Sequence, residues 1–249
     1  MSTIIQCQGV SQAFGSKKVL QQLDFTLQQG EVAALIGPNG AGKTTLFSIL
    51  CGYLKADSGS VLLFGHKPGS AALFAKVAAL PQDAQFDPAF SIGEQLDFYG
   101  RLQGLSRKAA HEETLRVLAL VDLADQVQQK AAALSHGMRK RAAIAQAFIG
   151  SPQLILMDEP TAGMAPQERN DLMALTKDLV VQRGMAVLFT EHSMDVVFAY
   201  ADRMIVLARG RLIAEGKPLE LRDHPKVQEV YFGTGKTFEK KAAANAEAA

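Results

Sequence analysis

Residues 37–45 read Gly-Pro-Asn-Gly-Ala-Gly-Lys-Thr-Thr, and this stretch decides the fold class. It fits Gly-x-x-x-x-Gly-Lys-[Ser/Thr], a phosphate-binding loop in which glycines let successive backbone N–H groups turn toward nucleotide phosphates. The lysine of this pattern brings a cation to the β- and γ-phosphates, and the hydroxyl after it holds Mg²⁺. The residues predicted to bind phosphate are Gly37, Pro38, Asn39, Gly40, Ala41, Gly42, Lys43, Thr44 and Thr45, with Thr44 also on the metal.

The flanks of the loop have the composition that this motif requires. Residues 31–36 form a short apolar run that suits a buried strand, and residues 43–50 begin as a good helix. Strand, glycine turn and helix place the positive end of the helix dipole against the phosphates. The sequence therefore predicts a nucleotide site at the start of this helix.

Size and composition favour one globular protein. The chain has 249 residues, 48% of them hydrophobic, which is enough for one α/β core with an inserted subdomain. Its net charge of +1 argues against nucleic acid as the main partner. The two cysteines, Cys7 and Cys51, do not suggest a disulfide framework and fit a reducing compartment.

The sequence contains no segment that we expect to enter a membrane. The first residues lack the features of a signal peptide, and no stretch reaches the roughly 18–20 apolar residues that span a bilayer. We therefore expect any link to a membrane to run through another protein. Residues 240–249 are of low complexity, and we expect a disordered tail there.

Short alternating runs surround the loop. Residues 23–27 alternate with period two and, together with residues 61–64, predict an antiparallel β-layer. Four residues are predicted to be turns of that layer: Gly59, Gly65, Pro68 and Gly69.

Beyond residue 90 the pattern becomes helical and then alternates. Ser91-Ile-Gly-Glu94 fits a capping box, Ser106 is a candidate cap for the next helix, and the helical block extends over about 91–150. Apolar runs at 153–157, 186–190 and 204–207 then alternate with helices, which favours a parallel sheet. The predicted fold class is α/β: a phosphate-loop NTPase core with a mostly parallel sheet, an N-terminal antiparallel β-layer and an inserted helical subdomain. We expect one domain over 1–239.

Two carboxylates complete the predicted site. Asp158 and Glu159 directly follow the apolar run 153–157. An acid at the end of a buried strand can reach a Mg²⁺ beside the phosphate loop, which is the role predicted for Asp158. Glu159 would face the space beyond the γ-phosphate and orient an attacking water.

With these residues in place, five further segments resemble those of ATP-binding cassette (ABC) ATPases. They are Phe14, Gln82 in Leu-Pro-Gln-Asp, Leu134-Ser-His-Gly-Met-Arg-Lys-Arg141, Thr161-Ala-Gly-Met-Ala-Pro166 and His192. In the family these positions are the adenine-stacking aromatic, the Q-loop glutamine, the signature motif, the D-loop and the switch histidine. The resemblance covers about residues 3–232 and implies the same fold.

The resemblance also implies roles for these residues. Phe14 would stack on adenine, although the residue type alone is also typical of a core aromatic. Gln82 would coordinate Mg²⁺ together with Thr44 and Asp158. Ser135 and Gly137 open a helix towards Phe148 and would cap the γ-phosphate held by a second subunit, whereas the sequence by itself shows only a helix cap at Ser135. The implied catalytic residues are Glu159, His192 and Lys43.

Three positions depart from the family pattern. His136 replaces the first signature glycine, Met138 replaces the usual glutamine, and Ala165 stands at the D-loop aspartate. Since Ser135 and Gly137 are retained, we expect γ-phosphate binding to persist. The alanine removes a polar contact across the dimer, and we expect weaker coupling between the two nucleotide sites.

The resemblance implies an ATPase that powers a membrane transporter. ATP with Mg²⁺ would bind two copies face to face, and hydrolysis would let them part. The implied partners are a second ATPase subunit of the same or a similar chain, transmembrane permease subunits and, for uptake, a solute-binding protein; nucleic acid is not among them. The implied location is peripheral, at the cytoplasmic face of the cell membrane.

Different segments of the sequence resemble ATPases that drive transport in opposite directions. Residues 161–164, 190–197 and 225–233 resemble ATPases of branched-chain amino-acid-type uptake systems, and lipopolysaccharide exporters end similarly. Residues 80–86 and 98–104 resemble exporters of drugs or polysaccharides. We slightly favour import of amino-acid-like or other small solutes, with export of a drug, lipid or polysaccharide as the alternative.

Another class of function stays open, namely a soluble ABC ATPase that acts as an assembly scaffold. No cysteine pair supports cluster binding, and transport is therefore preferred. Residues 89–92 and 98–99 are candidates either for the surface that docks a permease or for the core of the helical block.

Overall fold

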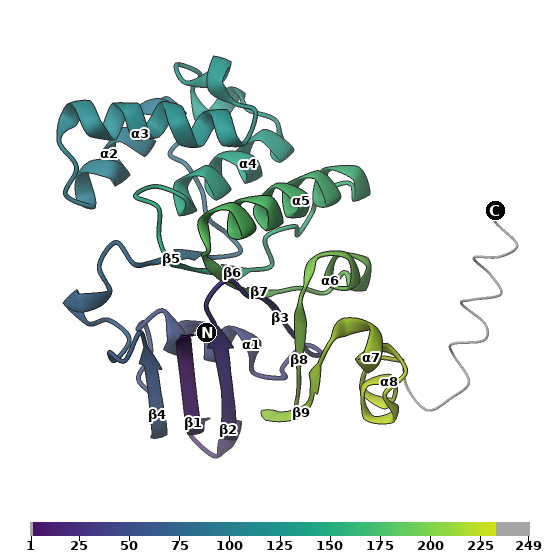
Figure 1. The fold of residues 1–249 in the computed structure, drawn as a ribbon. Coiled ribbons are helices and arrows are strands. Elements are labelled where there is room, and N and C mark those ends of the chain that lie inside the picture. The colour runs from purple at the N-terminus through teal and green to yellow at the C-terminus, as the bar shows by residue number, and fades with distance from the viewer. Residues whose placement is uncertain (1, 233–249) are drawn as a thin grey trace, which may run out of the picture.

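A computed structural model describes residues 2–232 of the chain. Two sheets lie below a helical block (Figure 1). The strands are β1 Thr3–Phe14, β2 Lys17–Gln28, β3 Val32–Ile36, β4 Ser58–Leu63, β5 Val77–Leu80, β6 Leu154–Asp158, β7 Ala186–Thr190, β8 Arg203–Ala208 and β9 Arg211–Gly216. The helices are α1 Lys43–Leu50, α2 Ile92–Leu102, α3 Arg107–Leu120, α4 His136–Ala147, α5 Pro166–Arg183, α6 Met194–Tyr200, α7 Pro218–Arg222 and α8 Pro225–Phe232.

The larger sheet is mostly parallel and buried on both faces. Its order is β5-β6-β7-β3-β8-β9, and only β9 is antiparallel to its neighbour. Alternate residues of β3 enter two different hydrophobic clusters: Ala34 packs towards the helices of the upper block, whereas Leu35 packs towards α1 and the smaller sheet. Burial on both faces explains why these strands are continuous apolar runs. The predicted α/β fold class is confirmed.

The smaller sheet is antiparallel and has the order β2-β1-β4. The predicted β-layer is therefore present, with β1 between the two segments that the sequence singled out. The prediction of a turn at Gly59 is wrong, since this residue lies inside β4. A β-carbon on Gly59 would lie 2.4 Å from the carbonyl oxygen of Gly9, so glycine allows β4 to approach β1 at an irregularity of the pairing.

Three helices within 91–150 form the block above the sheet (Figure 1). The predicted capping box is confirmed: the Ser91 hydroxyl accepts from the Glu94 N–H, and the Glu94 carboxylate accepts from the Ser91 N–H. Ser106 likewise caps α3 and Ser135 caps α4. Residues 240–249, where the sequence predicts a tail, lie outside the described residues.

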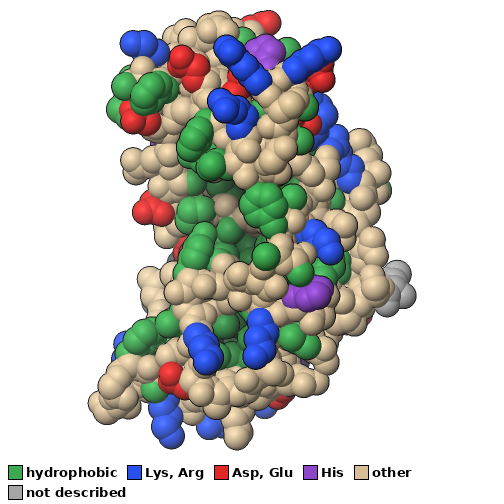
Figure 2. Space-filling view, turned by 90° about the vertical axis from the view of Figure 1, so that its left-hand side faces the viewer, with side chains coloured by type: hydrophobic (Ala, Val, Ile, Leu, Met, Phe, Trp, Pro, Cys, Tyr) green, Lys and Arg blue, Asp and Glu red, His purple; other side chains and the backbone are tan. Residues whose placement is uncertain are grey.

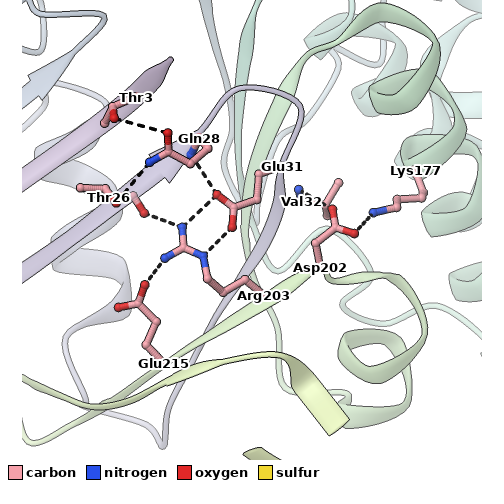
Figure 3. A network of polar contacts seen from close by, with 9 residues as sticks. All are labelled: Thr3, Thr26, Gln28, Glu31, Val32, Lys177, Asp202, Arg203 and Glu215. Atoms are coloured by element: carbon pink, nitrogen blue, oxygen red, sulfur yellow. Dashed lines mark hydrogen bonds and ion pairs between the residues drawn. The ribbon is translucent and has the colours of Figure 1, made fainter. Parts of the chain in front are cut away.

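One ion-pair network joins the two sheets at the end opposite the phosphate loop. Arg203, at the start of β8, donates from Nε to Glu31 at 2.5 Å and from a terminal nitrogen to the Thr26 carbonyl at 2.5 Å, and it also pairs with Glu215 of β9 (Figure 3). Burial alone would lower the pKa of Arg203, but the bonds and charges of Glu31 and Glu215 outweigh burial and raise it. The network fixes β8 against the turn between β2 and β3.

Replacing Arg203 tests the contribution of this network to stability. We expect Arg203→Met to lower the free energy of unfolding by about 3 kcal/mol, because the change leaves the largely buried Glu31 carboxylate without its partner. The matched control is Arg222→Met, because Arg222 pairs with Asp223 on the surface, and there we expect a loss below about 1 kcal/mol. Urea unfolding followed by circular dichroism measures both, and equal losses would contradict a structural role for the network.

Within residues 2–232, no helix combines the length and the apolar composition required to cross a bilayer.

Candidate functional site

The phosphate loop connects β3 to α1, as its flanks predicted. At three positions of the loop, a close backbone approach or a positive φ requires glycine. A β-carbon on Gly37 would lie 2.3 Å from the carbonyl oxygen of Leu207, and Gly40 and Gly42 adopt φ of 78° and 107°. Gly42 also lies against Val19 and Leu20 of β2. The smaller sheet thus closes one side of the loop.

Lys43 is the first residue of α1 and turns back over the loop. Its Nζ donates to the carbonyl oxygen of Gly37 at 2.7 Å. Burial lowers the pKa of Lys43, while the carboxylates of Glu159 and Asp158 act in the opposite direction. The ammonium therefore stands inside the loop with two acids in its field, where it can exchange carbonyl contacts for phosphate oxygens.

Asp158 is the last residue of β6 rather than the first residue after it. Its Oδ1 accepts from the Thr190 hydroxyl at 2.5 Å, and Thr190 is its register partner at the end of β7. Burial raises the pKa of Asp158, an effect that the bond from Thr190 opposes. The carboxylate is thus held at the edge of the sheet where the parallel strands β3, β6 and β7 end.

Glu159 follows with a left-handed backbone, φ 46°, which is strained for a residue with a side chain. Its N–H donates to the Thr190 hydroxyl at 2.9 Å. Its carboxylate contacts His192 Nε2 at 2.6 Å and accepts from Gln82 Nε2 at 2.9 Å. Three predicted site residues from separate loops therefore meet at this carboxylate.

Three polar residues of this region were not predicted from the sequence. The Thr190 hydroxyl donates to the Asp158 carboxylate and accepts from the backbone N–H of Glu159. Glu191 lies buried beside His192, and Lys140 of α4 donates to the Gln82 carbonyl at 2.9 Å. Thr190 and Glu191 directly precede the switch-histidine position at the end of an apolar strand, which is a signal the sequence offered. Lys140 had no such signal, because only the packing of α4 brings it to Gln82.

The remaining predicted residues lie apart from this cluster. Phe14 ends β1 and its side chain is 54% exposed, so it is not a core aromatic and is available for stacking. Ser135 caps α4 by accepting from the Met138 N–H at 3.2 Å, and Gly137 lies against Glu168 of α5. In residues 2–232, no hydrogen bond or ion pair joins Ser135 or Gly137 to the phosphate loop.

The oxygen groups of the site fit Mg²⁺. Thr44 carries an exposed hydroxyl, Asp158 a carboxylate and Gln82 an amide oxygen. Magnesium prefers oxygen ligands and commonly uses one or two carboxylates together with substrate phosphates and waters. The described residues contain no cluster of three or more acidic, histidine or cysteine side chains that would hold a metal without a substrate. The three oxygen groups of Thr44, Asp158 and Gln82 suit Mg²⁺ that is bound together with a nucleotide.

A groove lined by both apolar and uncharged polar residues lies beside the site, between the helical block and β5. The face seen in Figure 2 is hollowed and has hydrophobic side chains along its centre. None of the described residues that line the groove is charged; Phe74, Leu80, Tyr99, Leu102, Ala143 and Gln146 are among them. Phe98 is exposed beside the groove, whereas Ile92 is buried. The core interpretation of residues 89–92 and 98–99 therefore holds for Ile92, and Phe98 stays a candidate for the docking surface.

Comparison with protein families gives two matches. A family model described as "ABC transporter" matches residues 20–162, which is more than half of the chain. A second, described as "Branched-chain amino acid ATP-binding cassette transporter", matches residues 211–237.

Similar individual proteins agree with the first match. The Nod factor export ATP-binding protein I of Burkholderia lata is 38% identical over 216 residues, which are 86% of this chain and 71% of that protein. The linearmycin resistance ATP-binding protein LnrL of Bacillus subtilis is 34% identical over 220 residues, 88% of this chain and 70% of that protein. A solved ATP-binding cassette of an ABC transporter in its ADP conformation has a TM-score of 0.82 and 29% identity, with 94% of this chain and 100% of that chain covered.

Proposed function

Because this chain belongs to the ABC transporter family and is an ATPase of that family, we propose that it powers export through a membrane permease. The observation that carries the catalytic part is the meeting of His192 and Gln82 at the Glu159 carboxylate, beside Lys43 and Asp158.

In the proposed reaction, residues 37–45 hold the phosphates through backbone N–H groups and Lys43. Thr44, Asp158 and Gln82 would hold Mg²⁺, which neutralises charge on the β- and γ-phosphates when it is bound. Glu159 orients the attacking water and draws its proton. His192 Nε2 contacts the Glu159 carboxylate in this structure. In the reaction it would contact the γ-phosphate instead and stabilise the negative charge that develops there.

The site is one-sided, which supports pairing of two copies. The loop, both acids and His192 come from one side, whereas Ser135 and the N-terminus of α4 make no hydrogen bond or ion pair with the loop within residues 2–232. A helix N-terminus with a hydroxyl and a small residue is suited to an anion. We therefore assign Ser135 and Gly137 to the γ-phosphate held by a second subunit.

Export is preferred because of the similar proteins. The relatives at 38% and 34% identity carry names of export and resistance, and each matches over most of this chain. The slight preference for import, which the C-terminal resemblance suggested, is not supported by these names, nor is a solute-binding protein as partner. The match of residues 211–237 to a branched-chain amino acid model is the observation that still favours uptake.

The uncharged groove is the proposed docking surface for the permease. Two large hydrophobic side chains of its lining, Phe74 and Leu102, are exposed to solvent, which suits a surface that a partner covers. An apolar segment of the permease would bury them and hold the protein at the cytoplasmic face of the membrane. Because the groove adjoins Gln82 through residues 84–85, movement at the nucleotide would reach the permease through this segment.

Co-purification with a membrane protein tests this function. We expect the tagged chain, extracted gently with detergent, to co-purify with a multi-span membrane protein, and Phe98→Glu with Leu102→Glu to lose that protein, because two charges would be buried at the interface. The matched control is Leu219→Glu, at an exposed leucine of α7, and this variant should retain it. Recovery with soluble partners alone would instead favour the assembly scaffold, and co-purification of a solute-binding protein would favour import.

A further inference from the structure

Two loops of the site are joined by a buried contact that the proposed reaction does not use. Thr161 follows β6 and Glu191 follows β7, and their residues are only 1% and 2% exposed. The Thr161 hydroxyl donates to Oε1 of Glu191, and Oε2 of the same carboxylate accepts from the backbone N–H of His192 at 3.2 Å. One carboxylate thus connects the loop after β6 to the backbone of His192.

Two donors, the Thr161 hydroxyl and the His192 N–H, satisfy this buried carboxylate. Burial raises the pKa of Glu191, and the bonds from Thr161 and His192 oppose that effect. A buried carboxylate is costly unless donors satisfy it, so its position follows its donors. If Thr161 moves, the acceptor of the His192 N–H moves with it.

The residues joined by this carboxylate lie between Glu159 on one side and His136 on the other. At one end, His192 Nε2 lies 2.6 Å from the Glu159 carboxylate. At the other end, a β-carbon on Gly163 would lie 3.2 Å from Nε2 of His136, at the start of α4. The loop that carries Thr161 is therefore touched by the helix that would face the nucleotide of the second subunit.

We propose that Thr161 and Glu191 are positioning residues through which the loop 161–165 sets the place of His192 against Glu159. This inference rests on the roles proposed above for Glu159 and His192. Since Ala165 provides no carboxylate to a partner, the coupling of this loop to hydrolysis runs within one chain, from His136 through Thr161 and Glu191 to His192.

Removing one hydroxyl tests the link. We expect Thr161→Val, which keeps the shape, to lower kcat for ATP about ten-fold at unchanged KM, because misplacing a catalytic group affects the transition state more than binding. Thr161→Ser should restore kcat. The matched control is Thr176→Val, because Thr176 is equally buried and donates to the Leu172 carbonyl within α5; its kcat should equal that of the unmodified chain.

Amide hydrogen exchange of residues 186–196 gives a second result that does not depend on activity. Exchange should be faster in Thr161→Val than in the unmodified chain and in Thr176→Val. Unchanged kcat, a changed KM alone, or unchanged exchange would each overturn the inference. Should Thr161→Val fail to fold, Glu191→Gln is judged by the same criteria. If the unmodified chain hydrolyses ATP no faster than Glu159→Gln, the role of Glu159 fails, and the exchange result alone decides the inference.

Discussion

Glu159→Gln should lower kcat for ATP hydrolysis by about 10³-fold, because it removes the group that accepts the proton of the attacking water. Glutamine has nearly the same shape and can keep an oxygen towards His192, which lies 2.6 Å from Glu159 in the native chain. The left-handed backbone at residue 159 is fixed by the bond of its N–H to Thr190, and the substitution leaves that bond intact. The loss should therefore be one of chemistry and not of folding.

A coupled assay of phosphate release measures this loss, and equilibrium binding of a fluorescent ATP analogue measures what remains. We expect nucleotide binding to persist in the variant. Glu112→Gln is the control, because this carboxylate is exposed on α3, and its rate should equal that of the unmodified chain. If the Glu159→Gln protein hydrolysed ATP at the unmodified rate, another residue would have to orient and deprotonate the attacking water.

Lys43→Met should instead weaken the binding of ATP itself. The Lys43 ammonium stands within the loop, bonded to Gly37 at 2.7 Å, and no other cation of the described site lies inside the loop. Loss of charged hydrogen bonds of this kind costs about 1.5–3 kcal/mol each, so we expect the Kd for ATP to rise about 100-fold. Methionine retains most of the apolar stem, so α1 should remain packed.

Isothermal titration with ATP in the presence of Mg²⁺ measures this effect. Lys55→Met is the control, because Lys55 is an exposed lysine outside the phosphate loop, and its Kd should be unchanged. If Lys43→Met bound ATP with unaltered affinity, Lys43 would not be a phosphate-binding residue. Together the two variants separate binding, lost with Lys43, from hydrolysis, lost with Glu159.

Much of the site is local in sequence, and this part was predictable. The phosphate loop, its strand and its helix occupy one continuous stretch, so residues 31–50 predicted β3 and α1 almost to the residue. The caps at Ser91, Ser106 and Ser135 depend on a side chain and a backbone group three residues apart. Such contacts can be inferred without knowing the tertiary structure.

The parts that were missed depend on pairing between distant segments. The Thr190 hydroxyl bonds the Asp158 carboxylate and the Glu159 N–H only because β6 and β7 pair in a register that places Asp158 opposite Thr190. Lys140 reaches Gln82 only because α4 packs over the end of β5. Gly59 was predicted to be a turn because glycine is a common turn residue, whereas in the structure it permits close contact between two strands. Strands β5 and β9 were not predicted, since short segments at the sheet edges have weak periodicity.

The central claim is that ATP is held between two copies of this chain, one providing the phosphate loop and the other the start of α4. Light scattering of Glu159→Gln at saturating ATP and Mg²⁺ tests it most directly, because this variant binds ATP without consuming it. We expect twice the monomer mass of 26.7 kDa with ATP and the single mass with ADP. A single mass under both conditions, with ATP shown to be bound, would contradict the account.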